Sequence, residues 1–292
     1  MKIGKILQER GKSLSFEFFP PKEAAGEVTL FKTVSKLKLM NPTFLSVTYG
    51  AGGSTSKNTE KVVSRIIKET DMTVMPHMTI VNQSKDDIKA MLQDYHKLGV
   101  ENVLALRGDP PEGSKAAVSQ NSDFSYAKDM VKLAVSLGYY SVAVAVYPEG
   151  HLEAPSLEKD IEYTKQKVDA GAEFAITQMF FNNRVYYNFL DRIRKAGIKI
   201  PIIPGILPIT DINKVQQFAV RCGASIPAEI VARFSNAKTS GEMRKIGLET
   251  TINQCADLLK NGVSYFHFYS LNRTEAVTEI IDNVGLRKLA LS

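Results

Sequence analysis

The sequence contains no tryptophan, only two cysteines and only four histidines, and these scarcities exclude several kinds of protein. Cys222 and Cys255 form no CxxC pair, so a disulfide framework and a thiolate zinc site both lack ligands; both cysteines are expected on helices. The histidines show no HExxH or comparable spacing, which argues against a metal site. No apolar stretch approaches the roughly 18 residues of a membrane span, and the charged N-terminus lacks a signal-peptide core, so we expect a cytoplasmic protein.

Motifs of several common enzyme classes are also missing. The glycine-rich segment 50–55 fails the GxGxxG pattern because residue 55 is threonine, and no Walker A sequence is present. A GxSxG nucleophile elbow is absent. No predicted strand ends in a lysine that could form a Schiff base. These absences argue against a Rossmann nucleotide site, a serine hydrolase and a Schiff-base aldolase, although segment 50–55 could still cradle a phosphate or simply turn.

The composition is that of an ordinary soluble globular chain, with 292 residues, 44% hydrophobic and 23% charged. Lysine and arginine number 37 against 31 aspartate and glutamate, a net charge of +6, and the basic residues are scattered among acidic ones. This pattern argues against a nucleic-acid-binding stripe. Because the sequence shows no repeat, low-complexity segment or linker, we expect residues 1–292 to form a single domain.

Short apolar or β-branched runs alternate with amphipathic segments along the whole chain. Helical spacing marks the amphipathic segments, and Ser84 and Asp211 are expected to be N-caps. The eight runs predicted to be strands are Ser13–Phe19, Phe44–Thr48, Thr73–Thr79, Asn102–Leu106, Ser141–Val146, Phe174–Gln178, Pro201–Ile206 and Tyr265–Tyr269.

Eight alternating strand and helix units, several with strands apolar almost throughout, predict a parallel sheet covered by helices. This number of units closes a (β/α)8 barrel, the TIM-barrel fold of the α/β class, and an open doubly wound sheet is the alternative. The longer segment Pro227–Asn261 before the last strand predicts one or two extra helices, as a lid or an oligomer surface.

Polar residues cluster where the predicted strands end, at the edge of a barrel where catalytic groups gather. Any one of them could instead be a satisfied core or loop residue. The residues at these ends are Glu17, Thr48, Tyr49, His77, Arg107, Gly108, Asp109, Tyr147, Glu149, Gln178, His267, Asn272 and Arg273.

Glu17 lies in the apolar run FEFFPP, so it would lose hydration if it points into the barrel. Burial favours the protonated form of a carboxyl, which suits a general acid. The alternative is a carboxylate that faces solvent or pairs with a nearby basic residue. In the run RGDPP, Arg107 offers a donor fork suited to phosphate, Gly108 allows close backbone approach and Asp109 offers an acceptor. An ordinary ion pair between Arg107 and Asp109 is the alternative there.

The sequence resembles bacterial 5,10-methylenetetrahydrofolate reductases from about residue 14 to 285. The runs that carry the resemblance are FEFFPP at 16–21, SVTYGA at 46–51, PHMT at 76–79, ALRGD at 105–109, AITQ at 175–178, IPGILP at 203–208 and FHFYSLNR at 266–273. The resemblance implies a (β/α)8 barrel that holds FAD noncovalently. It also implies hydride transfer from NADH or NADPH through the flavin to 5,10-methylenetetrahydrofolate in ping-pong order, which would supply methyl groups for methionine synthesis.

The resemblance also implies roles for individual residues. Glu17 matches the general acid that assists opening of the folate's five-membered ring, and Asp109 matches the carboxylate between flavin and pterin. Substrate-binding positions correspond to Asp109, Gln178, Phe218 and Arg273. Cofactor-binding positions correspond to Thr48, Tyr49, Ala51, His77, Arg107, Gly108, Asp109, Ala127, Tyr147, His151, Ala154, Asp160 and Lys167. Lys214 and Tyr163 stand where better-known bacterial members carry glutamine and asparagine.

Two other functions remain open. One is a different FAD barrel, such as a proline-dehydrogenase-like enzyme, although the Glu17 run and ALRGD count against it. The other is a barrel subunit that docks into a larger complex through 227–261. We expect small-molecule substrates, a homo-oligomer, no nucleic-acid or membrane partner and no metal.

Overall fold

The computed structural model describes residues 1–21, 23–49, 56–108 and 125–290. Its strands form one parallel sheet in the order β7-β6-β5-β4-β3-β2-β1-β9-β8. The strands are β1 Ser13–Phe18, β2 Phe44–Val47, β3 Val74–Thr79, β4 Asn102–Leu106, β5 Ser141–Val146, β6 Phe174–Thr177, β7 Ile202–Ile203, β8 Gly205–Ile206 and β9 Tyr265–Tyr269. All eight predicted strands are present with ends that shift by one residue at most, and the seventh is split in two.

The seventh strand, split into β7 and β8, joins β6 to β9 and completes the barrel. Pro204 lies between β7 and β8 and has no backbone N–H to donate to a ladder. β7 pairs with β6, whereas β8 pairs with β9, so the strand changes neighbour at the proline. The Pro204 carbonyl accepts a hydrogen bond from the His267 N–H at 3.1 Å. The sheet is therefore a closed TIM barrel and not an open doubly wound sheet.

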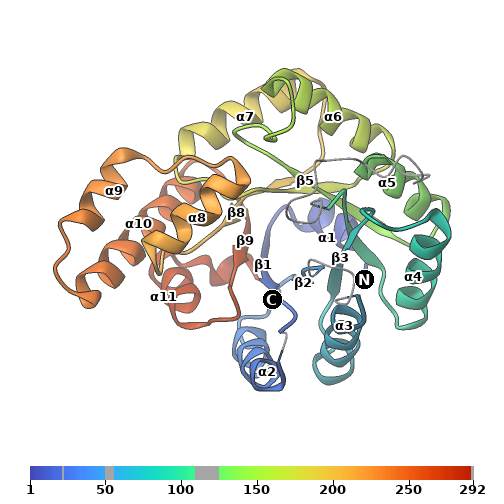
Figure 1. The fold of residues 1–292 in the computed structure, drawn as a ribbon, viewed down its shortest axis with the longest axis horizontal. Coiled ribbons are helices and arrows are strands. Elements are labelled where there is room, and N and C mark those ends of the chain that lie inside the picture. The colour runs from blue at the N-terminus through green and yellow to red at the C-terminus, as the bar shows by residue number, and fades with distance from the viewer. Residues whose placement is uncertain (22, 50–55, 109–124, 291–292) are drawn as a thin grey trace.

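Helices surround the strands in Figure 1, as the alternating pattern predicts. The 227–261 region contains two helices, α9 and α10, which lie beside α8 and α11 on one flank of the barrel. The helices are α1 Ile3–Arg10, α2 Ala24–Lys38, α3 Ser56–Thr70, α4 Lys85–Lys97, α5 Ala127–Ser136, α6 Leu157–Asp169, α7 Asn183–Lys195, α8 Ile212–Cys222, α9 Ala228–Ser235, α10 Ser240–Lys260, α11 Glu275–Val284 and the 3₁₀ helix η1 Leu286–Leu289. None of the described helices is both long and apolar enough to cross a membrane.

Both predicted N-caps are confirmed. The Ser84 hydroxyl accepts from the Asp87 N–H at 3.2 Å, and the Asp87 carboxylate accepts from the Ser84 N–H at 3.1 Å, which completes a capping box. The Asp211 carboxylate accepts from the N–H groups of Asn213 and Lys214 at the start of α8. Each cap satisfies backbone donors that the first helical turn leaves without partners.

Apolar side chains form two layers in the barrel. Residues of β1 alternate, so Leu14, Phe16 and Phe18 face the surrounding helices in the larger cluster. A smaller cluster fills the barrel interior, where Ile3 and Leu7 of α1 pack against side chains from the strands. The N–H groups at the start of α1 donate to side chains at the beginnings of two strands, from Ile3 to Asn102 at 2.7 Å and from Gly4 to Ser141 at 3.0 Å. Helix α1 thus closes the N-terminal end of the barrel with an apolar floor.

We predict that Leu7→Ala destabilises the protein by about 2–5 kcal/mol, because it opens a cavity in this fully buried floor. Lys5→Ala on the exposed side of the same helix is the control and should change the free energy of unfolding by less than about 0.5 kcal/mol. Denaturant unfolding monitored by circular dichroism measures both. Equal effects of the two substitutions would show that α1 does not close the barrel in solution.

Candidate functional site

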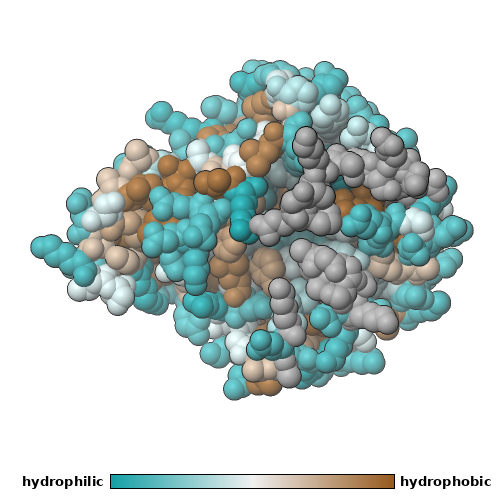
Figure 2. Space-filling model, in the orientation of Figure 1, coloured by the Kyte–Doolittle hydropathy of each residue, from teal (hydrophilic) through white to brown (hydrophobic). Residues whose placement is uncertain are grey.

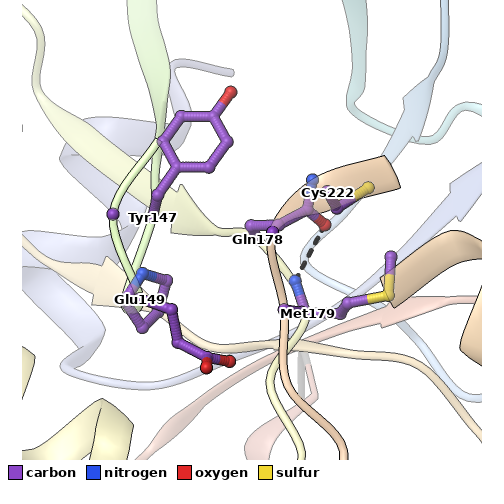
Figure 3. Close-up of a pocket in the computed structure, with 9 residues that line it drawn as sticks. Tyr147, Glu149, Gln178, Met179 and Cys222 are labelled. Carbon is purple, nitrogen blue, oxygen red and sulfur yellow. Dashed lines mark hydrogen bonds between the residues drawn. The ribbon is translucent and has the colours of Figure 1, made fainter. Parts of the chain in front are cut away.

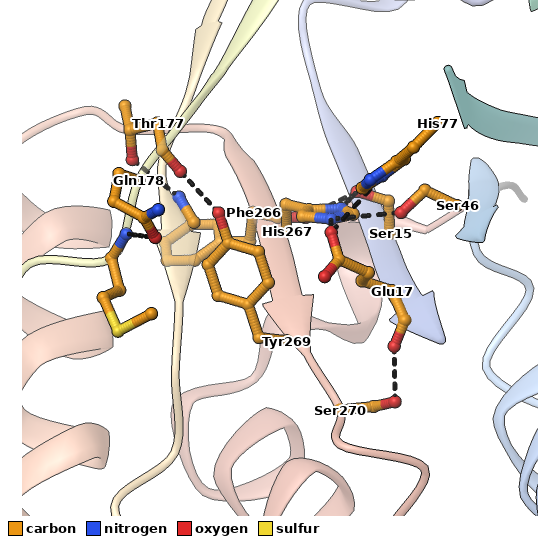
Figure 4. A network of polar contacts seen from close by, with 12 residues as sticks. Ser15, Glu17, Ser46, His77, Thr177, Gln178, Phe266, His267, Tyr269 and Ser270 are labelled. Atoms are coloured by element: carbon orange, nitrogen blue, oxygen red, sulfur yellow. Dashed lines mark hydrogen bonds and ion pairs between the residues drawn. The ribbon is translucent and has the colours of Figure 1, made fainter. Parts of the chain in front are cut away.

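A group of polar side chains lies inside the barrel above the apolar floor. The inward positions of β1 carry Ser15 and Glu17, while β3 contributes His77 and β9 contributes His267 (Figure 4). The Glu17 Oε2 atom lies 3.4 Å from His77 Nε2 and 3.6 Å from His267 Nε2. Glu17 and His77 are each 6% exposed and His267 is fully buried. Of the two alternatives that the sequence leaves open for Glu17, the structure shows the buried one, and the carboxyl has two histidine neighbours in place of a lysine or arginine.

Hydrogen bonds around His267 indicate its tautomer. The Ser15 hydroxyl donates to the Phe266 carbonyl at 3.2 Å, and the same oxygen lies 2.8 Å from His267 Nδ1. Because a hydroxyl has a single proton, His267 Nδ1–H is the donor to Ser15. In the neutral ring Nε2 then presents a lone pair, and that atom faces Glu17 and, at 3.4 Å, the Ser46 hydroxyl. The ring of His267 is therefore oriented with Nδ1 toward Ser15 and Nε2 toward the carboxyl of Glu17.

His77 is uncharged at neutral pH. Burial lowers the pKa of His77 from 6.5 to about 4, an effect that Glu17 opposes and His267 reinforces. Its Nε2 atom has no hydrogen-bond partner within the described parts of the chain. His77 is therefore a neutral polar neighbour of the Glu17 carboxyl. Its buried Nε2 atom is also a group with which a ligand could form a hydrogen bond.

A second polar group joins β6 to β9. The Tyr269 hydroxyl donates to the Thr177 carbonyl at 2.6 Å, and burial raises the pKa of this phenol well above its usual value. A Cβ atom at Gly205 would lie 2.4 Å from that carbonyl oxygen and 2.5 Å from the Tyr269 hydroxyl. Only glycine fits there, so Gly205 leaves the space that this contact needs.

A small open cavity, with room for about one water molecule, lies between the end of β5 and the end of α8. Figure 3 shows Tyr147 and Glu149 on one side, with Gln178, Met179 and Cys222 on the other. The Gln178 side-chain carbonyl accepts from the Met179 N–H at 2.9 Å.

The C-terminal end of α8 borders this cavity. Phe218 precedes Cys222 by four residues, so both lie on one face of α8. Phe218 is 37% exposed, although it is a large apolar side chain. In Figure 2 apolar surface appears beside α8 and α9 within a mostly hydrophilic face. The loop after α8 is fixed to the other side of the cavity because Glu149 accepts from the Ser225 N–H at 2.9 Å and from its hydroxyl.

Arg107, at the end of β4, pairs with Glu153, and its Nε also donates to the Gly108 carbonyl of its own loop at 3.3 Å. Both terminal nitrogens of the guanidinium donate to the two carboxylate oxygens, with the Nη2–Oε1 distance at 2.9 Å. The Arg107 guanidinium lowers the pKa of Glu153. The His151 ring lies edge-on to Tyr147 at 4.7 Å between ring centroids, and its Nδ1 accepts from the Glu153 N–H.

Asp160 and Lys167, both on α6, lie close to His151. The Lys167 ammonium donates to the Ala145 carbonyl at 2.7 Å, and burial lowers its pKa to about 8 although Asp160 opposes the shift. Burial raises the pKa of Asp160, whose carboxylate accepts from the His151 N–H at 3.2 Å. The structure thus brings together Arg107, Tyr147, His151, Asp160 and Lys167 as one cluster.

The other predicted site residues are distributed around the same end of the barrel. Thr48 and Tyr49 follow β2, and the Tyr49 hydroxyl accepts from Gln83 at 2.9 Å. Gly108 has φ 86°, and a Cβ atom added at this position would lie only 2.8 Å from the Cβ atom of Thr79. Ala127 begins α5, Ala154 donates its N–H to the His151 carbonyl, and Arg273 follows β9 with an exposed side chain. Asp109 and Ala51 lie outside the described residues.

Sequence reasoning missed Glu153 and Cys222 as site residues, and it named His267 at a strand end without its contact with Glu17. That contact could have been found, because the first and last strands of a closed barrel must be neighbours and Ser15 and His267 are paired in register. The Glu153 partner of Arg107 had no local signal, since 46 residues separate the pair. Cys222 is predicted correctly on a helix, but its place at the cavity depends on how α8 packs.

The chain is similar to known proteins over most of its length. A family model described as methylenetetrahydrofolate reductase matches residues 2–285. A 5,10-methylenetetrahydrofolate reductase of Pectobacterium carotovorum subsp. carotovorum is 37% identical over 277 residues, covering 94% of this chain and 91% of that protein. Methylenetetrahydrofolate reductase (NADH) 1 of Arabidopsis thaliana is 35% identical over 297 residues, covering 98% of this chain and 50% of that protein.

One solved structure has the same fold. It is described as an uncharacterized protein from Clostridium thermocellum that binds two copies of 5-methyl-5,6,7,8-tetrahydrofolic acid. Its TM-score is 0.66 at 14% identity, with 98% of this chain and 99% of that chain covered.

The burial of His77 generates a prediction about pH. In the unfolded chain the imidazole binds a proton near pH 6.5, whereas in the folded protein it does so only near pH 4. The unfolded state therefore binds more protons between these values, and the free energy of unfolding falls by up to about 1.4 kcal/mol per pH unit as the pH drops from 6.5 to 4. His77→Gln should reduce this slope, measured by denaturant unfolding across the range. His96→Gln, at an exposed histidine, is the control, and an unchanged slope in His77→Gln would refute the assignment.

Proposed function

The chain belongs to the methylenetetrahydrofolate reductase family, and from this premise we propose that it reduces 5,10-methylenetetrahydrofolate to 5-methyltetrahydrofolate. We further propose that residues 1–292 act as one catalytic domain, that FAD is the cofactor and that NADH or NADPH is the electron donor. The name of the plant relative supports NADH.

The observation that carries the proposal is the setting of Glu17. Its carboxyl lies inside the barrel between a neutral His77 and the lone pair of His267, where water has little access. A carboxyl placed there, next to the ligand space of the barrel, is positioned to act as a general acid. Reduction of the substrate requires a proton on a ring nitrogen of the folate so that its five-membered ring opens. We assign that proton transfer to Glu17.

The residues around β4 and α6 have the chemistry that FAD requires. The buried Lys167 ammonium and the Arg107 guanidinium are suited to a pyrophosphate, and Asp160 offers an acceptor for hydroxyl groups. The left-handed backbone at Gly108 allows close approach of a flat ring, and the orphaned Nε2 of His77 is available to a ligand. When bound, FAD carries the hydride from nicotinamide to the methylene carbon.

Substrate contacts are proposed for the other side of the same end of the barrel. Gln178 borders the cavity and its amide N–H₂ group can donate to a ring, while the exposed Phe218 can stack on either ligand. Arg273 has no side-chain partner among the described residues, so its charge is available to a folate carboxylate. We assign Asp109 to the pterin and the flavin from the family motif alone. Because one face is proposed for both ligands, nicotinamide and folate would bind in turn.

An absorption spectrum of the purified protein tests the proposal most directly. We predict a yellow protein whose flavin band disappears when NADH is added without oxygen and returns when 5,10-methylenetetrahydrofolate follows. Reduction of the flavin by proline, with no reoxidation by folate, would assign the barrel to the proline-dehydrogenase-like alternative. A protein that binds no flavin would overturn the proposal.

We predict that Glu17→Gln separates the two half-reactions. The amide keeps the size of the side chain but cannot supply the proton, so NADH should still reduce the flavin while reoxidation by folate slows about 100- to 10,000-fold. Anaerobic stopped-flow absorbance measures each step. Glu9→Gln, at an exposed position of α1, is the matched control and should behave as the unmodified protein. An equal loss in both half-reactions would contradict the role of Glu17 as the acid.

A further inference from the structure

The carboxamide of Asn272 joins the loop after β9 to the end of β1. The Phe19 N–H donates to Asn272 Oδ1 at 2.9 Å, and Asn272 Nδ2 donates to the Phe19 carbonyl at 2.8 Å. Register pairing between β1 and β9 ends at Glu17 and Tyr269, so the backbone ladder does not reach these residues. The amide side chain therefore continues the pairing of the two strands by two residues, in the way that a peptide group would.

Neighbouring hydrogen bonds strengthen this connection. The Ser270 hydroxyl donates to the Glu17 carbonyl at 2.6 Å (Figure 4) and accepts from the Asn272 N–H at 3.2 Å. The Thr33 hydroxyl of α2 donates to the Asn272 carbonyl at 3.0 Å. Both polar groups of the side chain and both of the backbone groups of Asn272 are thus used within one network.

The backbone of the loop is held in an unusual conformation. Leu271 and Asn272 have φ values of 48° and 56°, the left-handed region that leucine in particular rarely adopts. Such a conformation persists only where the surrounding contacts determine it. This conformation turns the chain sharply at Leu271 and Asn272. The N–H of the next residue, Arg273, then donates to the Ser270 carbonyl at 2.9 Å.

The two segments that the amide joins each carry a group assigned to the folate. Glu17 lies two residues before Phe19, and Arg273 lies one residue after Asn272. The strands below are already held by five register pairs from Ser13–Tyr265 to Glu17–Tyr269. The hydrogen bonds between Asn272 and Phe19 are therefore not needed to close the barrel. What they fix is the spacing between the segment that carries Glu17 and the segment that carries Arg273.

We propose that Asn272 is a positioning residue for the folate substrate. Its carboxamide sets the distance between Glu17, which meets the reacting ring, and Arg273, which meets the folate carboxylate. This inference rests on the proposed function and adds to it a residue that touches neither the flavin nor the substrate.

Asn272→Gly tests the proposal because glycine accepts a positive φ and removes the amide without adding backbone strain. Asn41→Gly is the matched control, since Asn41 also has a positive φ, 48°, and is exposed in the turn before β2 at the opposite end of the barrel. We expect Asn272→Gly to retain flavin and its rate of reduction by NADH, while the KM for 5,10-methylenetetrahydrofolate rises about tenfold, the equivalent of about 1.4 kcal/mol. Asn41→Gly should leave both steps unchanged.

Asn272→Asp gives a second, isosteric test. It keeps the acceptor for the Phe19 N–H but places a carboxylate oxygen against the Phe19 carbonyl, where Nδ2 donated before. The KM for folate should rise at least as much as in Asn272→Gly. Hydrogen exchange of the Phe19 amide, measured without any ligand, should be faster in Asn272→Gly than in the unmodified protein.

The outcomes separate this inference from the proposed function. If the unmodified protein neither binds flavin nor turns over folate, the proposed function fails, whatever Asn272 does. If the unmodified protein is active but both Asn272 variants match Asn41→Gly in folate KM, the positioning role is wrong. The positioning role is also wrong if reduction by NADH and oxidation by folate weaken equally, because a general loss of structure would explain that result.

Discussion

The parallel pairing of β1 with β9 brings together groups that lie about 250 residues apart in the chain, including Ser15 and His267, which are separated by 252 positions. That pairing joins the first strand to the last, and the barrel is completed by the seventh strand, which pairs with β6 before Pro204 and with β9 after it. In an open sheet Glu17 would stand at or near an edge without His267. The chemistry proposed for the carboxyl thus follows from the topology of the barrel.

The polar interior is tolerated because apolar packing surrounds it. Below it, α1 and the inward residues of the strands form a floor, and Phe44 stacks on His267 at 5.8 Å between ring centroids. Almost every buried polar atom near Glu17 has a partner within hydrogen-bond distance, the Nε2 of His77 being an exception among the described residues. Because these side chains are buried, specific contacts with neighbouring groups determine how they are oriented.

Local patterns were enough to predict the strands, the caps at Ser84 and Asp211 and the extra helices of segment 227–261, because each depends on neighbours within a few residues. The apolar run around Glu17 indicated burial as one of two alternatives, and only the structure decides between them. Its histidine partners could not be predicted, since they come from β3 and β9 and depend on register. Similarly, the sequence around Arg107 predicts a contact with either phosphate or its own loop, but its partner Glu153 lies on a later connection. The ligand assignments came from family motifs, which periodicity alone does not provide.

The pair between Arg107 and Glu153 also bears on how an anionic cofactor would enter. The carboxylate accepts from Nη1 and Nη2, so a diphosphate that used the same two nitrogens would take the place of Glu153. Binding of the cofactor would then be an exchange of anions, and its net free energy would be the difference between two similar attractions. The displaced Glu153 would be a carboxylate without its arginine partner on the exposed loop before α6.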